Sequence, residues 1–276
     1  MNNNKILVLG GKGKTGRKVN DRLIKLGHIT RIGSRNEAVP FDWEDENTWP
    51  DILDGINKLY ITFQPDLAVP SAFKTIKRFT SLAVKTGIQK IVLLSGRGEK
   101  EAQRCEQIIM NTDVNWTVVR CDWFSQNFSE NFLLEPIVAG HVALPRANIL
   151  IPFVDTDDIA DVVVTALLDD IHTHKIYELT GPRLLTFEQA VNEIAKVTGR
   201  NITFEEISLK AYKKMLRAHQ IPEDYIWLVN YLFSNVLDGK NSSTTNDIEI
   251  VLKRKAKDFS EYVKETAATK IWNPAK

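Results

Sequence analysis

The sequence predicts an α/β protein with a doubly wound parallel sheet and a smaller, mostly helical C-terminal lobe. Three observations predict this fold class. Short apolar runs alternate with amphipathic stretches through the first 180 residues, which is typical of repeated strand–helix units. A glycine-rich loop directly follows the first apolar run. After about residue 180 the pattern changes to helices with one further short strand.

Composition excludes several classes of protein. The 276 residues are 43% hydrophobic, enough for one large α/β unit or a nucleotide-binding domain with a smaller lobe. Lys and Arg total 36 against 35 for Asp and Glu, so the net charge of +1 gives no field that attracts nucleic acid or an anionic membrane. The two cysteines, Cys105 and Cys121, lack the spacing of a disulfide framework or a redox or metal motif. No stretch reaches the roughly 20 apolar residues of a membrane-spanning helix, so we expect a cytoplasmic protein without a membrane partner.

The predicted strands of the sheet are short apolar runs. They cover residues 5–9, 28–33, 58–62, 90–94, 115–120 and 175–179. Two stretches between them have apolar residues at helical spacing and end at a glycine cap, namely Val19, Leu23 and Leu26 before Gly27, and Ile76, Phe79 and Ala83 before Gly87. A third helix follows the capping residues Asp155 and Thr156, and its apolar face is Ile159, Val162, Val163, Ala166 and Leu167.

The C-terminal lobe is predicted to consist of helices around one strand. Thr186 is expected to cap a helix that runs to Gly199. A short strand is predicted over 202–207, and the composition of residues 239–246 indicates a surface loop. Further helices are predicted over 208–218, 222–237 and 258–269.

The loop after the first strand reads Gly10-Gly11-Lys12-Gly13-Lys14-Thr15-Gly16. It is not a P-loop, because that motif requires a glycine five residues before Gly13, where the chain has Val8. Gly10, Gly13 and Gly16 instead have the G-x-x-G-x-x-G spacing of a dinucleotide loop between a strand and a helix. Missing Cβ atoms let a pyrophosphate approach the backbone, and a helix N-terminus offers N–H groups to it. We therefore predict a Rossmann domain whose loop residues contact a dinucleotide: Gly10, Lys12, Gly13, Lys14, Thr15 and Gly16. The alternative is a tight turn without a ligand.

The end of the second strand indicates which dinucleotide is bound. An NAD-binding domain usually has Asp or Glu there to accept a hydrogen bond from the ribose 2'-hydroxyl. This chain has Ser34 and Arg35, a hydroxyl and a planar cation suited to a 2'-phosphate, so NADP(H) is predicted over NAD(H). Alternatively, Arg35 is an ordinary loop arginine, since Glu37 is close enough in sequence to pair with it or to serve a ribose.

Six segments together resemble the NmrA-like group of atypical short-chain dehydrogenases, and within it the branch of ergot-alkaloid reductases such as agroclavine and festuclavine dehydrogenases. In chain order they are residues 9–15, Phe41-Asp42-Trp43, Val92-Leu93-Leu94-Ser95, residues 116–120, residues 122–128 and residues 151–160. The resemblance implies NADP(H) in a cleft between a Rossmann-like sheet and a small C-terminal lobe. It further implies contacts to adenine (Asp42, Trp43), along the cofactor (Thr62, Phe63, Gln64), near the nicotinamide (Ser95) and to the substrate (Trp123, Phe124, Asn127). Cys121, at a strand end that faces the expected cleft, is a further candidate contact to the cofactor.

The domains follow from this resemblance and from the change of pattern near residue 180. We expect an NAD(P)-binding domain over 1–155, with its sheet completed by about 175–180. A smaller substrate lobe is expected over 181–276, with 121–150 contributing to the cleft.

The departures from the family pattern concern catalysis. Ordinary short-chain dehydrogenases use a Tyr-x-x-x-Lys pair in which the Lys lowers the pKa of the Tyr, and no Tyr of this chain has a Lys four residues later. Many NmrA-like reductases keep a Lys at the position that corresponds to Ala102. Cys121 and Asp122 also replace the Pro and Thr that commonly open the substrate segment. Ser95 is left as the one candidate proton donor.

The sequence thus supports an NADP(H)-dependent reductase that transfers hydride to a small unsaturated acceptor, such as an iminium-like or quinone-like group. The alternative is a non-catalytic NADP(H) sensor that binds a protein partner, and a nucleotide-sugar epimerase ranks last because it normally requires the missing Tyr and Lys. No metal site is expected from Asp169, Asp170, His172 and His174, whose spacing does not suit one. Trp123, Phe124 and Phe128 are candidates for either the pocket wall or the core.

Overall fold

A computed structural model describes residues 5–274. Two units can be distinguished, and each is built from several segments of the chain. Of the described residues, unit 1 contains 5–121, 156–179 and 247–253, and unit 2 contains 122–155, 180–246 and 254–274. None of the helices within residues 5–274 combines the length and the hydropathy that crossing a bilayer requires.

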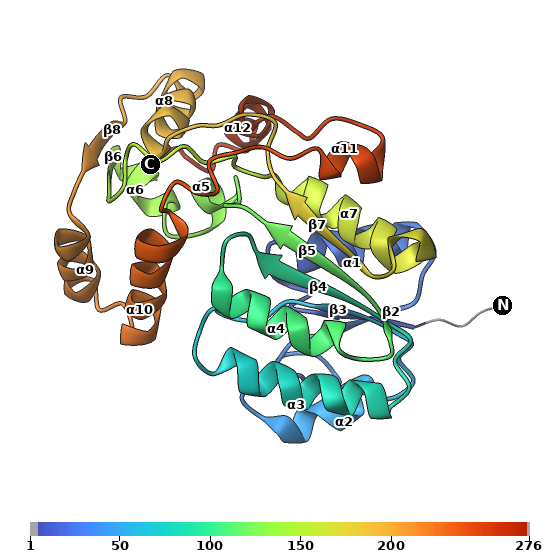
Figure 1. Ribbon diagram of the computed structural model, residues 1–276. Coiled ribbons are helices and arrows are strands. Elements are labelled where there is room, and N and C mark those ends of the chain that lie inside the picture. The colour runs from blue at the N-terminus through green and yellow to red at the C-terminus, as the bar shows by residue number, and fades with distance from the viewer. Residues whose placement is uncertain (1–4, 275–276) are drawn as a thin grey trace. The chain divides into compact units, whose positions relative to one another are not determined.

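Unit 1 is organised around a six-stranded parallel sheet with the order β2-β1-β3-β4-β5-β7, which confirms the predicted fold class (Figure 1). Its strands are β1 (Ile6–Leu9), β2 (Thr30–Gly33), β3 (Lys58–Ile61), β4 (Lys90–Gly96), β5 (Asn115–Cys121) and β7 (Lys175–Leu179). Every residue of β1 is buried, as a strand covered by helices on both faces requires. Because β2 and β3 lie on opposite sides of β1, the strand order reverses at β1 and β3. Ligands of doubly wound sheets bind at the carboxyl ends of the strands at such a reversal.

Helices cover both faces of this sheet (Figure 1). The larger ones are α1 (Gly16–Lys25), α3 (Ala72–Lys85), α4 (Lys100–Met110) and α7 (Thr156–Leu168), and the shorter ones are α2 (Trp49–Leu53), α11 (Asp247–Leu252) and the 3-10 turns η1 (Glu46–Thr48) and η2 (Asp170–His172). The apolar faces predicted for α3 and α7 are buried. For α1 the prediction was wrong at Leu26, which is 60% exposed, because the helix already ends at Lys25. Gly27, at φ +80°, reverses the chain there as a left-handed cap.

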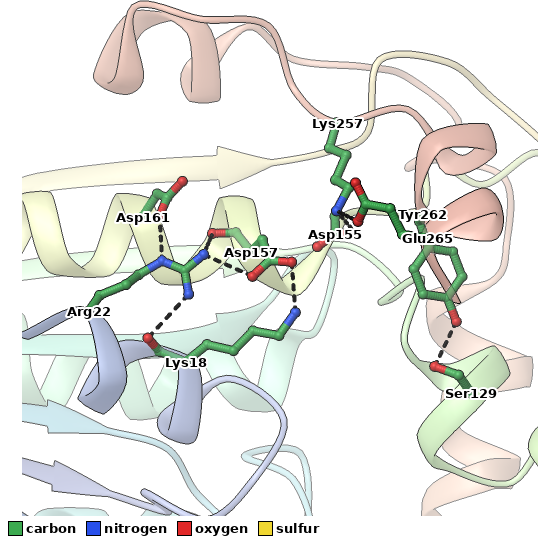
Figure 2. Close-up of polar contacts among 9 residues, drawn as sticks. All are labelled: Lys18, Arg22, Ser129, Asp155, Asp157, Asp161, Lys257, Tyr262 and Glu265. Atoms are coloured by element: carbon green, nitrogen blue, oxygen red, sulfur yellow. Dashed lines mark hydrogen bonds and ion pairs between the residues drawn. The ribbon is translucent and has the colours of Figure 1, made fainter. Parts of the chain in front are cut away.

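Helices α1 and α7 are joined by an ion-pair network (Figure 2). Arg22 donates to Asp157 and Asp161, and the Lys18 ammonium lies 2.9 Å from the Asp157 carboxylate. Burial alone would raise the pKa of Asp157, but the hydrogen bonds from Arg22 and Lys18 outweigh it and hold that pKa below its ordinary value. The network therefore fixes the helix that begins at the glycine-rich loop.

Unit 2 has an aromatic core and a two-stranded parallel sheet of β6 (His141–Leu144) and β8 (Thr203–Glu206). Its helices are α5 (Asn127–Glu130), α6 (Leu134–Ala139), α8 (Phe187–Thr198), α9 (Leu209–Ala218), α10 (Glu223–Tyr231) and α12 (Phe259–Ala268), with a π-helical segment η3 (Leu232–Val236). Thr186 and Gln189 form the capping box that begins α8, so the predicted cap is confirmed. Tyr262 donates to Ser129 at 2.8 Å (Figure 2), and Trp272 donates to the carbonyl oxygen of Phe128 at 2.7 Å.

An acid-sensitive ion pair in unit 2 gives a first testable prediction. Arg183 donates hydrogen bonds to Asp258, which lowers the pKa of Asp258 from 3.8 to about 2. A carboxyl group with a lowered pKa stabilises the folded state at pH values above its ordinary pKa. This contribution decreases as the pH falls from about 4 to about 2. Urea unfolding of Asp258→Asn should therefore show about 1 kcal/mol less stability than the wild type at pH 7, a modest figure because the pair is partly solvated, and a much smaller difference near pH 2. An equal difference at both pH values would contradict this reading.

Candidate functional site

The glycine-rich loop forms a cradle without side chains at the end of β1. Gly10 has φ +63°, and its N–H donates to the carbonyl of Gly33 at 3.0 Å. A Cβ at Gly10 would lie 2.3 Å from Thr62 Oγ1, and a Cβ at Gly16 would lie 2.2 Å from the Gly10 carbonyl oxygen. Only glycine fits at either position, so the backbone at the start of α1 approaches the carboxyl ends of β1 and β3 closely.

Thr15 lies at the N-terminus of α1 but turns its side chain inward. Its hydroxyl accepts a hydrogen bond from Tyr60 at 3.0 Å, and Thr15 is only 5% exposed. Burial raises the pKa of Tyr60, which therefore keeps its proton and remains a donor. What Thr15 offers to a ligand is thus its backbone.

The segment after β2 places polar and charged groups beside the glycine-rich loop. Ser34 is half-buried and Arg35 is exposed. Glu37 pairs with Lys12 of the loop, with 2.6 Å between Lys12 Nζ and Glu37 Oε1. Glu37 therefore pairs with Lys12 and not with Arg35, the alternative that the sequence left open. Phe41 donates its backbone N–H to Ser34, which closes the segment.

The aromatic residues expected near adenine belong to a ring cluster. The Trp43 ring lies 4.8 Å from the Phe41 ring and 5.0 Å from the Phe63 ring, and its indole N–H donates to the carbonyl of Thr62. Trp43 is half-buried. Asp42 accepts a hydrogen bond from the backbone N–H of Glu44, which sets the turn that carries Trp43.

Ser95 and Cys121 lie at the carboxyl ends of the neighbouring strands β4 and β5, and both residues are buried. The Ser95 hydroxyl donates to the fully buried Glu106 carboxylate at 2.6 Å. Arg120 donates to both oxygens of Glu106 and extends the network to Glu178. Cys121 is buried at 5% exposure. This network was missed in the sequence, because nothing in its spacing joins Glu106 on α4 to strands β4 and β5.

A second pair that the sequence did not reveal lies after β3 and β4. Asp66 and Glu99 interact through their side chains. Burial raises the pKa of Asp66, whereas the bond to Glu99 and the backbone N–H of Ala68 oppose that rise. Ala102, where a Lys was expected from the family pattern, is fully buried in the first turn of α4.

The expected substrate residues lie in unit 2, and one of them lines a pocket. The pocket is lined by Asp122, Trp123, Ile149, Leu150, Ile151, Pro152, Val236, Leu237, Gly239, Asn241 and Ser242. The Trp123 ring packs edge-on against Phe187 and Phe233, with centroids 5.4 and 5.5 Å away, so this side chain is both pocket wall and core. Phe124 pairs with Val154 through a backbone bridge, and Asn127 begins α5. These two residues are not among those that line the pocket.

No group of three or more His, Cys, Asp or Glu side chains between residues 5 and 274 is arranged to hold a metal ion. Of the four clustered residues considered in the sequence, Asp170 pairs with Lys90 and His172 hydrogen-bonds Tyr177. Both interactions are internal to unit 1.

Comparison with known protein families shows to which family the chain belongs. The model of the NmrA-like family matches residues 102–265, more than half of the sequence. The chain belongs to the NmrA-like family. This NmrA-like protein is 27% identical to prestalk A differentiation protein A of Dictyostelium discoideum over 95% of its own length and 92% of the relative's. It is 27% identical to the uncharacterized oxidoreductase YesF of Bacillus subtilis over 99% of both chains, and 26% identical to festuclavine dehydrogenase of Aspergillus fumigatus over 95% and 98%.

Solved structures of the same fold include complexes with a dinucleotide. An NADPH-dependent quinone oxidoreductase of Escherichia coli complexed with NADPH aligns at a TM-score of 0.80, with 18% identity over 94% of this chain and 99% of that one. NmrA, a negative transcriptional regulator in complex with NAD, aligns at 0.72, with 14% identity over 97% and 96%. At these identities the likeness establishes the shared fold of this NmrA-like protein.

Proposed function

We propose that this protein is an NADP(H)-dependent reductase that transfers hydride to a small unsaturated organic acceptor. The observation that carries the proposal is the glycine cradle at the reversal of strand order, with Lys12, Ser34 and Arg35 beside it. The missing Cβ atoms leave the space that a pyrophosphate needs against the start of α1. The hydroxyl and cations suit the 2'-phosphate of NADP(H). The residues present therefore fit the cofactor.

The remaining contacts are those that the resemblance to the NmrA-like family implies. We propose that Asp42 and Trp43 contact the adenine end, that the strand-end residues Thr62, Phe63, Gln64, Ser95 and Cys121 follow the cofactor, and that Trp123, Phe124 and Asn127 contact the acceptor. NADPH supplies the hydride when it is bound. The chain binds and orients the two reactants, and its Ser95 proton is held by Glu106. Acceptors that need little acid assistance, such as iminium-like or quinone-like groups, fit this arrangement best.

The names of the relatives support an oxidoreductase. They include festuclavine and agroclavine dehydrogenases and an NAD(P)H azoreductase of Xenophilus azovorans. These activities belong to the relatives, and they define the acceptor classes with which a screen should begin.

The second candidate function is a non-catalytic NADP(H) sensor that binds a protein partner. It is favoured by a specific observation, the buried Ala102 at the family's Lys position in a chain without a Tyr-x-x-x-Lys pair. A structural neighbour described as a transcriptional regulator shares the fold. A sensor must bind the oxidised and reduced cofactor with different affinities, because a ligand shifts a state only by its differential affinity.

Calorimetric titration with NADPH, NADP and NADH in parallel, followed by an assay of NADPH oxidation with quinone, iminium and azo acceptors, separates the two functions. Preference for the phosphorylated cofactors together with turnover of an acceptor supports the reductase. Binding that differs between NADPH and NADP without turnover of any acceptor supports the sensor. If no dinucleotide binds, the glycine-rich loop is only a turn and both proposals are wrong.

The role of Arg35 gives a second testable prediction. Arg35→Ala should weaken NADPH binding by about 1.5 to 3 kcal/mol, the usual contribution of a charged hydrogen bond, and should spare NADH. Titration calorimetry of both cofactors measures the two effects. Lys85→Ala, which removes an exposed cation from α3, is the control and should change neither affinity. Equal losses for NADPH and NADH with Arg35→Ala would refute the assignment.

A further inference from the structure

Two lysines lie next to each other at the amino edge of the sheet in unit 1. Lys58 is the first residue of β3 and Lys90 is the first residue of β4, and the two residues are direct partners in the parallel register of these strands. Residues that are partners in a sheet direct their side chains to the same face. Because like charges disfavour each other, each ammonium group makes the other easier to deprotonate.

Both lysines donate hydrogen bonds at the C-terminal end of α7. Lys58 Nζ donates to the carbonyl oxygen of Leu167 at 2.7 Å, and Lys90 Nζ donates to the carbonyl oxygen of Asp169 at 2.9 Å. Lys90 Nζ also lies 2.7 Å from the Asp170 carboxylate. Between residues 5 and 274, no carboxylate forms an ion pair with Lys58. The two amines are therefore close in space but unequally neutralised.

Their exposure differs as well. The Lys90 side chain is only 2% exposed, so a reagent in solution does not reach its amine. Lys58 is half-buried. Burial and the charge of Lys90 lower the pKa of Lys58, and the opposing effect of Asp170 is the smallest of the three. A lysine beside another cation keeps more of its amine neutral, and the neutral amine is the nucleophilic form.

We propose that Lys58 is a preferred acylation site, at which the amine reacts with a small acyl phosphate or acyl thioester because Lys90 lies beside it on the sheet. The Lys58 ammonium first gives a proton to water. The nitrogen electron pair then forms a bond to the acyl carbonyl carbon. The bond from that carbon to the phosphate oxygen or the thiolate sulfur breaks, and the leaving group keeps the bonding electrons. The nitrogen loses a second proton to water, which leaves an amide without any oxidation or reduction.

The fold accommodates this modification. The amide keeps one N–H for the carbonyl of Leu167 and loses the charge that repels Lys90. Lys58 lies at the amino end of β3, whereas the glycine-rich loop follows the carboxyl end of β1, the parallel neighbour of β3. The two sites are therefore at opposite edges of the sheet, and the inference does not depend on the proposed function.

The reactivity of Lys58 is a third testable prediction. The full chain is incubated at mildly alkaline pH with acetyl phosphate or with acetyl coenzyme A, and the acetylated fraction of each lysine is followed over time by peptide mass spectrometry. Lys58 should be acetylated about three to ten times faster than Lys85, an exposed lysine of α3. Labelling by either reagent supports the site, and the comparison of the two reagents identifies the class of donor.

Two substitutions should change this rate in opposite directions. Lys90→Met removes the neighbouring charge and should slow acetylation of Lys58 about three- to tenfold. Asp170→Asn removes the opposing carboxylate and should speed it about twofold, a small effect because the Asp170 side chain is 82% exposed. This surface substitution decides the matter alone if Lys90→Met does not fold. Asp113→Asn, which removes an exposed carboxylate beyond α4, is the matched control and should not change the rate.

The rates of Lys58 and Lys85 decide the proposal. Faster acetylation of Lys58 than of Lys85, with a further increase in Asp170→Asn, supports a site activated by its neighbouring charges. Acetylation of Lys58 that is no faster than that of Lys85 overturns the proposal. A rate at Lys58 that Asp170→Asn leaves unchanged or lowers also overturns it, because the neighbouring charges then do not control the amine. None of these results depends on whether the protein binds NADPH.

Discussion

Replacing Glu106 with alanine is expected to destabilise the protein by about 3 to 5 kcal/mol, the cost of removing one partner from a buried ion pair. Glu106 is fully buried and receives hydrogen bonds from Ser95 and from two nitrogens of Arg120. The Glu106 carboxylate is the main reason that the pKa of Arg120 lies above its ordinary value. Without it, a partly buried guanidinium keeps only its contact with Glu178.

Urea unfolding followed by circular dichroism measures this free energy. Glu101→Ala is the matched control, because Glu101 lies on the same helix and pairs with Arg104 near the surface. That exposed pair should contribute about 0 to 1 kcal/mol. If the two substitutions cost the same, the buried network does not join α4 to the sheet as described.

Alanine at Gly16 is expected to abolish tight cofactor binding. In the first turn of a helix, Gly to Ala normally stabilises by up to about 1 kcal/mol. Here the sign should reverse, because the added Cβ would lie 2.2 Å from the Gly10 carbonyl oxygen, a backbone atom that cannot swing aside. We expect a loss of stability of about 1 to 3 kcal/mol from overpacking and at least about a tenfold loss of NADPH affinity as the loop moves.

Gly55→Ala separates general destabilisation from damage to the cradle. Gly55 has φ +68° in the same unit, and an added Cβ there meets nothing within 4 Å. It should cost about 1 to 2 kcal/mol through its left-handed backbone and leave NADPH affinity unchanged. Thermal melting and NADPH titration of both variants test the pair of effects. Full NADPH affinity in Gly16→Ala would show that the cofactor does not depend on this cradle.

The sequence predicted the sheet well because burial on both faces leaves a local signal. All six predicted strands of the sheet exist, with ends shifted by at most two residues. Strand β6 was missed because His141-Val142-Ala143-Leu144 is short and its hydrogen bonds go to β8, more than 55 residues away. Helix α11 was missed for a similar reason, since six residues after a polar loop carry too little periodicity to distinguish a helix.

The position of the glycine-rich loop could be predicted because its signal is local, whereas side-chain contacts that depend on packing could not be predicted. The spacing of Gly10, Gly13 and Gly16 indicates a cradle, and its place between β1 and α1 is as expected. No spacing rule pairs Lys12 with Glu37 or Asp66 with Glu99, because each pair is formed by loops whose approach is set by the parallel register of their strands. The inward turn of Thr15 likewise depends on Tyr60, which belongs to another strand.

The chain passes between the two units several times, and this limits the order in which they can fold during synthesis. Unit 1 needs β7 to extend its sheet beside β5 and includes α11, which ends at Leu252. Domains generally fold as units while the ribosome delivers the N-terminal segments first. In this protein unit 1 is complete only with residues 247–253, which follow most of unit 2 in the sequence. Truncation before that point should therefore yield an incomplete first unit, and the order of synthesis favours concerted rather than sequential completion of the two units.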